Sequence, residues 1–187
     1  MDGGTPIKNN LSWRSVLGGF ISLCMSGLYN SARAQMTLSP EAKFKLLSTK
    51  GNSNCSAEFL DLIPKMPKDA RLQGSCCSPM ELTRYKKQIA GLVKYNAIAD
   101  IPPDPYDIEA GLAQKLLGSY DLELTAAQQK EYDYAMEHSQ EKGPCCCRCW
   151  RWKVYGGLAK LLIRDHGMKG VQVTEVWDLS DGCGGAG

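Results

Sequence analysis

The pattern of hydrophobic and polar residues along the chain predicts a series of short to medium helices. Residues 106–117 and 145–165 each place apolar side chains at the three- and four-residue spacing of one helix face. No stretch of useful length alternates as a half-buried strand does. We therefore expect an all-α fold, a single compact domain of about six helices. The clearest apolar stripe ends near residue 95 and consists of Leu82, Tyr85, Ile89, Leu92 and Val93.

Capping residues and glycines refine these predicted helices. A serine or threonine before an apolar stripe is a typical N-cap, and proline is favoured at the first helical position. Gly156 and Gly157 fall inside the predicted helix over 145–165, where each costs about 1 kcal/mol relative to alanine. That cost predicts close approach of another backbone, or a kink. The predicted N-caps are Ser39, Ser56, Ser78 and Thr125.

The N-terminal segment has the pattern of a secretory signal peptide over residues 1–34. A positively charged start is followed by an apolar stretch over 16–28, and Ala32 and Ala34 supply the small residues that a signal peptidase requires. We expect cleavage near Ala34 and a periplasmic or extracellular location. The remainder, 35–187, is then one cysteine-rich helical domain without a transmembrane span.

Composition and charge narrow the class of partner. The chain has 187 residues, of which 43% are hydrophobic and 22% are charged, and its formal net charge is +2. The excess comes from residues 1–34, since 19 basic and 19 acidic residues remain from Gln35 onward. Nucleic-acid binders need a broad excess of Lys and Arg, so we do not expect nucleic acid as a partner. We expect a metal ion, or a protein of the cell envelope.

The nine cysteines, against only two histidines, carry the candidate chemistry. Cys76 and Cys77 come just before the helix predicted from Ser78, and a second cluster opens the helix predicted over 145–165. Helix N-termini stabilise anions and lower thiol pKa values. The segment from Lys142 to Arg164 adds six basic residues and no acidic one. The second cluster consists of Cys145, Cys146, Cys147 and Cys149.

Three functions remain open for these thiols. The first is a site for copper(I), zinc or an iron–sulfur cluster, with the second cluster as primary ligands. Cys76, Cys77 and Cys183 would be supporting ligands or disulfide partners, and His138 is a further candidate ligand because it precedes the cluster closely.

The second function is a disulfide-stapled interaction module, since export favours disulfides. Neighbouring cysteines cannot all pair among themselves, so staples would reach Cys55, Cys76, Cys77 or Cys183. The third function is a thiol oxidoreductase. No Ser/His/Asp order, phosphate loop or nucleotide fingerprint is present, so we expect binding rather than catalysis.

The segment Pro144-Cys145-Cys146-Cys147-Arg148-Cys149 resembles the P-C-x-C-x-C motif of the PCYCGC family of exported bacterial proteins. The resemblance implies an envelope location and assigns Cys145, Cys147 and Cys149 as the sulfurs of the motif. Cys146 and Arg148 replace the motif's Tyr and Gly, and the Gly-His pair that should follow is absent at that spacing.

Overall fold

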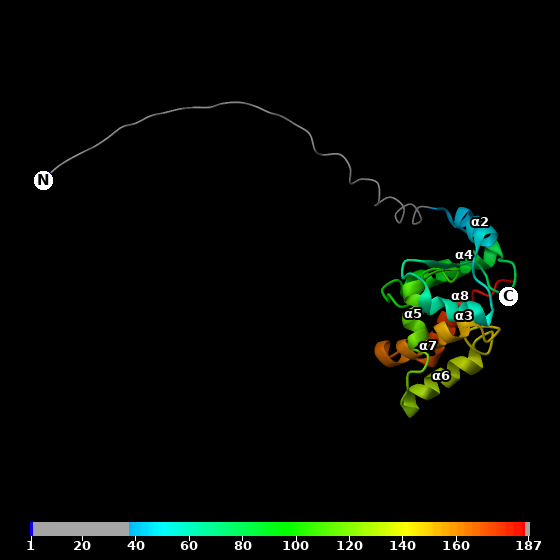
Figure 1. Ribbon diagram of the computed structural model, residues 1–187. Coiled ribbons are helices and arrows are strands. Elements are labelled where there is room, and N and C mark those ends of the chain that lie inside the picture. Colours follow the sequence, from blue (N-terminus) through cyan, green and yellow to red (C-terminus); the bar gives the residue numbers. More distant parts are fainter. Residues whose placement is uncertain (2–37, 186–187) are drawn as a thin grey trace. The chain divides into compact units, whose positions relative to one another are not determined.

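A computed structural model describes Met1 and residues 38–185, which form a mostly helical unit from Leu38 onward (Figure 1). The signal-peptide prediction for residues 1–34 and its cleavage site lie outside the described part, apart from Met1. Among the described residues, no helix combines the length and apolarity that crossing a bilayer requires. The α-helices are α2 (Pro40–Lys50), α3 (Ala57–Leu62), α4 (Leu82–Leu92), α5 (Ala110–Gly118), α6 (Ala126–His138), α7 (Trp150–His166) and α8 (Gly170–Ser180).

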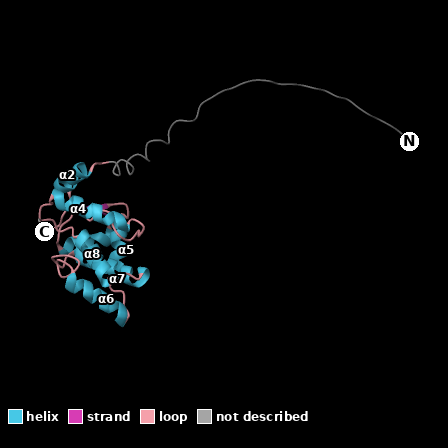
Figure 2. Ribbon diagram, turned by 180° about the vertical axis from the view of Figure 1, so that it is seen from behind, coloured by secondary structure: helices cyan, strands magenta, loops and turns pink. Residues whose placement is uncertain are grey.

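The expectation of an all-α fold needs one correction, because a small sheet is present. Strands β1 (Arg71–Gln73) and β2 (Asp107–Glu109) pair antiparallel, with Leu72 opposite Ile108. Figure 2 shows the strands in magenta among the helices. Three-residue strands are too short to display an alternating pattern, so hydrophobic periodicity does not predict them. Two 3₁₀ turns, η1 (Ile63–Lys65) and η2 (Val93–Tyr95), follow α3 and α4.

The predicted helix over 106–117 begins later than expected, at Ala110. The preceding residues form β2, and the first N–H groups of α5 are bonded to the segment before β1. Ala110 donates to the carbonyl of Ala70 at 2.7 Å, and Gly111 donates to that of Lys68 at 2.8 Å. These bonds satisfy donors that a helix start leaves free.

A buried charge cluster fixes the sheet to α2. The Asp107 carboxylate is 2.9 Å from Arg71 Nε and 3.0 Å from Lys43 Nζ. Burial alone would raise the pKa of Asp107, but the hydrogen bond from Arg71 and the charge of Lys43 outweigh it and hold that pKa below its usual range. The sheet therefore depends on an ionised carboxylate.

Three of the four predicted N-caps are confirmed. Ser39, Ser56 and Thr125 accept hydrogen bonds from the first turns of α2, α3 and α6. Ser78 is not a cap, because α4 starts at Leu82 and the Glu81 carboxylate accepts from the first turn instead.

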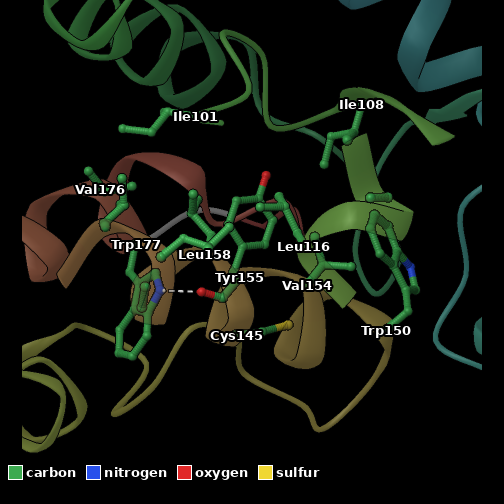
Figure 3. Close-up of a cluster of buried hydrophobic side chains, with 14 of the residues drawn as sticks. Ile101, Ile108, Leu116, Cys145, Trp150, Val154, Tyr155, Leu158, Val176 and Trp177 are labelled. Carbon is green, nitrogen blue, oxygen red and sulfur yellow. Dashed lines mark hydrogen bonds between the residues drawn. The ribbon is translucent and has the colours of Figure 1, made fainter. Parts of the chain in front are cut away.

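The core is built around α7. Its residues Trp150, Val154 and Leu158 are fully buried, and they meet side chains of α5, α8 and β2 (Figure 3). The indole N–H of Trp177 in α8 donates to the backbone carbonyl of Tyr155 at 3.0 Å. Helix α7 is thus held from several sides, and its N-terminal end is fixed in place.

The two mid-helix glycines of α7 mark close packing rather than a kink. A Cβ atom built on Gly157 would lie 1.9 Å from the carbonyl oxygen of Leu116 in α5, and one on Gly156 would lie 2.8 Å from the Tyr120 ring. The predicted close approach of another backbone is therefore confirmed.

Candidate metal centre

All eight cysteines of the described residues meet in one place, although they come from four separate segments. Cys55 precedes α3, the pair Cys76 and Cys77 follows β1, the run over 145–149 precedes α7, and Cys183 follows α8. Each sulfur lies within 4.0 Å of at least one other. The contacts form one connected network.

The solvent-facing side of the network consists of four sulfurs. The Sγ atoms of Cys55, Cys77 and Cys147 form a triangle with sides of 3.0, 3.4 and 3.5 Å. Cys146 lies 4.0 Å from Cys77. Cys77 and Cys146 are exposed, so this side is open to incoming ligands.

The core-facing side consists of the other four sulfurs. Cys145 lies 2.8 Å from Cys183 and 3.9 Å from Cys149, and Cys76 lies 3.9 Å from Cys183. Cys145, Cys149 and Cys183 are only 1%, 6% and 3% exposed. Contacts of 3.7 Å between Cys76 and Cys77, and of 3.9 Å between Cys145 and Cys147, join the two sides.

The run over 145–149 is a loop rather than the start of a helix, because α7 begins at Trp150 with Cys149 as its N-cap. A tight turn delivers the chain from α6 into this loop. The Ser139 hydroxyl accepts from Gly143 N–H at 2.8 Å, and a Cβ on Gly143 would lie 2.5 Å from the Trp152 ring. The predicted helix start at Cys145 is therefore wrong by five residues.

The C-terminal segment inserts Cys183 into the network by pairing with the loop that carries Cys77. The carbonyl of Cys183 accepts from Cys77 N–H at 3.3 Å and from Ser78 N–H at 2.8 Å. Gly184 has φ of +81°, and a Cβ on it would lie 2.0 Å from the Ser78 carbonyl oxygen. This pairing also explains why Ser78 starts no helix.

Three groups of these cysteines could hold a metal ion, since their sulfurs lie within 4.8 Å of one another. In the part of the chain that the structure describes, every cysteine is free. Thiolates at about 2.3 Å around a tetrahedral ion lie about 3.8 Å apart, close to most distances found here. The groups are Cys77, Cys146, Cys147 and Cys183; Cys55, Cys76 and Cys149; and Cys145, Cys147 and Cys149.

Arg151 supplies a buried positive charge next to the core-facing sulfurs. It is 1% exposed, and its Nη atoms donate to the carbonyls of Pro105 and Gly74 at 2.6 and 3.0 Å. Its Nε has no partner, and no carboxylate of the described residues lies within 4.0 Å of it. A Cβ on Gly182 would lie 2.2 Å from Nη1, so the guanidinium touches the segment that carries Cys183.

Two thiols, one on each side of the network, are favoured as thiolates. Hydrogen bonds from Cys145, Cys149 and Cys183, with the charge of Arg151, lower the pKa of Cys76 despite its partial burial. Burial opposes ionisation of Cys147, but hydrogen bonds from neighbouring thiols outweigh it and lower its pKa. A thiol that donates a hydrogen bond to a thiolate is harder to ionise, so the pKa of Cys145 is raised. The charge support expected from the basic segment thus comes from Arg151.

The structure brings together every cysteine predicted as a ligand, and it adds Cys55, which the sequence suggested only as a staple partner. The one available signal was that Cys55 completes an even set of eight. His138 is not part of the three groups. It is exposed at the end of α6, with its ring stacked on Tyr134 and its Nδ1 2.8 Å from the Tyr134 carbonyl oxygen.

Comparisons of the chain with protein-family models, with curated proteins and with solved structures gave no match. The resemblance of residues 144–149 to the PCYCGC motif stays a prediction. Its three sulfurs, Cys145, Cys147 and Cys149, are one of the groups that could hold a metal ion.

Proposed function

We propose that this protein is exported and binds soft metal ions through its cysteine thiolates. The observation that carries the proposal is the meeting of eight unbonded sulfurs from four segments at spacings of 2.8–4.0 Å. Gathering so many thiols costs conformational entropy in four loops, and a shared ion would offset that cost.

The buried guanidinium of Arg151 supports thiolates over neutral thiols or disulfides. A buried charge without an opposite charge is strongly unfavourable. Only an anionic group of sulfurs would balance Arg151, since no carboxylate of the described residues reaches it. A metal–thiolate centre has that negative charge, whereas a disulfide has none.

The short spacings favour copper(I) or zinc over an iron–sulfur cubane. In a cubane each cysteine binds a different iron at the outside of the cluster, so the cysteine sulfurs are kept apart. Here the sulfurs of Cys55, Cys77 and Cys147 lie 3.0–3.5 Å from one another, close enough for all three to share one ion. Soft thiolate donors select copper(I) and zinc.

A second candidate function, the disulfide-stapled interaction module, is favoured by the two shortest contacts. The sulfurs of Cys145 and Cys183, at 2.8 Å, and of Cys55 and Cys77, at 3.0 Å, lie inside van der Waals contact. Both distances exceed the about 2.05 Å of a disulfide. On oxidation these would be the first two pairs to bond.

One experiment separates the two candidates. The full chain is purified anaerobically without chelator, its metal is measured by mass spectrometry, and its thiols are titrated after acid denaturation without reductant. Metal binding predicts stoichiometric copper or zinc and every thiol titratable, nine in the full chain and eight after cleavage behind Ala34. Metal-free protein with at least four thiols missing would refute the proposal and support the disulfide module.

Export is tested separately in a bacterial host. We expect the protein in the envelope or medium, with Gln35 as the N-terminal residue found by sequencing. Protein that stays in the cytoplasm with residues 1–34 attached would contradict this part of the proposal.

A further inference from the structure

We infer that the eight sulfurs hold one polynuclear metal cluster, and that metal is passed from it to an external thiolate acceptor through Cys77 and Cys146. This inference rests on the proposed function and adds to it the nuclearity of the centre, its direction of exchange and the chemistry of its partner.

The nuclearity follows from sulfurs that are shared between groups. Cys147 contacts Cys55 and Cys77 on the solvent-facing side and Cys145 on the core-facing side, and it belongs to two of the three candidate groups. Cys76 links Cys77 and Cys183 in the same way. A thiolate sulfur has more than one lone pair and can bridge two ions. Eight thiolates in separate four-sulfur sites hold at most two ions, whereas bridged thiolates hold more.

The direction of exchange follows from exposure and charge. Cys77 and Cys146 are exposed, while Cys145, Cys149 and Cys183 are buried. The buried charge of Arg151 lies on the core-facing side only and strengthens the hold of the cluster there, because it favours negatively charged thiolates. An incoming ligand can therefore reach ions bound by Cys77 and Cys146 without any opening of the fold.

The exchange step is a ligand substitution without redox change. The acceptor sulfur bonds to a solvent-facing ion, and the bond from that ion to Cys77 or Cys146 breaks. The proton lost by the acceptor thiol is taken up by the released cysteine thiolate. The acceptor is a thiol, either a small molecule or a cysteine pair on a peptide, because only a comparably soft ligand can compete for the ion.

The test uses the full chain loaded anaerobically with copper(I). Release is followed with an excess of bathocuproine disulfonate, alone, with glutathione, or with a peptide that contains a Cys-x-x-Cys pair. We expect more than two ions per chain and two phases of release. The slow phase requires local opening, so it should be at least about tenfold slower. Acceleration of the fast phase by glutathione or by the peptide identifies which source of thiolate is accepted.

The double variant C77S/C146S should lose the fast phase and keep the slow rate constant, and both positions are exposed, so the fold should persist. A second measurement needs no variant: limiting iodoacetamide added to the loaded chain after the fast phase should modify Cys77 and Cys146, which that release frees, and should spare Cys145, Cys149 and Cys183, which the remaining ions protect. Two or fewer ions, a single release phase, or equal changes in both phases would overturn the inference while leaving metal binding intact. A chain that binds no metal would refute the proposed function itself.

Discussion

Replacement of Arg151 by methionine should have little effect on the stability of the metal-free protein but should weaken metal binding. Methionine keeps an unbranched side chain of similar reach but removes the charge and both hydrogen bonds to the carbonyls of Pro105 and Gly74. Lysine at the same position keeps the charge and serves as the matched control.

The magnitudes follow from the surroundings of the guanidinium. In the metal-free protein, R151M leaves two buried carbonyls unpaired at about 1–3 kcal/mol each, and it relieves the burial of an unbalanced charge, which costs several kcal/mol. These effects nearly cancel, so the free energy of unfolding should change by no more than about 2 kcal/mol. In the loaded protein the cluster loses the buried positive charge of Arg151 on its core-facing side. Loss of such an outer-shell partner weakens metal binding by about 10–100-fold.

The assay pairs urea unfolding of the metal-free protein with competitive copper(I) titration of the same preparations. R151M should weaken metal binding by about tenfold or more, and R151K by less. If R151M binds copper(I) as tightly as the wild type, the guanidinium does not balance a thiolate cluster, and the reasoning from its burial is refuted.

Three further predictions concern the fold and its link to the cysteines. G157A should destabilise the protein by about 2 kcal/mol or more in urea unfolding, because its new methyl group meets a backbone carbonyl. The control G118A, whose methyl group has nothing within 4 Å, should be neutral or stabilising. Equal stabilities of the two variants would contradict the packing of α5 on α7. Because the pKa of Asp107 is lowered on folding, its ionised carboxylate stabilises the fold above about pH 4, and this stabilisation is lost as the pH falls below that value. D107N should therefore cost about 1–3 kcal/mol at pH 7, and the difference from wild type should vanish in acid; a difference independent of pH would speak against the ionised carboxylate. G184A should lower copper(I) affinity more than G185A. Both glycines have positive φ, but only a Cβ atom on Gly184 would lie 2.0 Å from a backbone oxygen. Equal affinities would show that the C-terminal pairing does not place Cys183.

Local sequence rules predicted the helices whose ends are decided locally. Ser39, Ser56 and Thr125 cap helices because their side chains each reach an N–H group only three residues ahead. The same rule failed at Ser78, where the backbone N–H is bonded to Cys183, 105 positions along the chain. Pairing between segments so far apart leaves no periodic signal in the sequence.

The sequence predicts which cysteines form most of the candidate site, but not how the chain brings them together. The cysteines of the second cluster were expected on the first turn of a helix, and they occupy a loop that the Ser139–Gly143 turn holds in place. Cys55 stands alone in the sequence, which predicts it only as a disulfide partner of the second cluster. His138 was named for its nearness in sequence, yet the end of α6 leaves it exposed beside Tyr134.

Cys55 and Cys183 lie far apart in the sequence but belong to one network of sulfurs, so a metal centre there would act as a cross-link. An ion or cluster that binds both sulfurs closes a loop of roughly 130 residues. In the chain-entropy model this lowers the conformational entropy of the unfolded chain and stabilises the fold by about 5 kcal/mol. That amount is comparable to the whole stability of a small domain, about 5–15 kcal/mol. The supply of metal would then decide how long the chain stays folded.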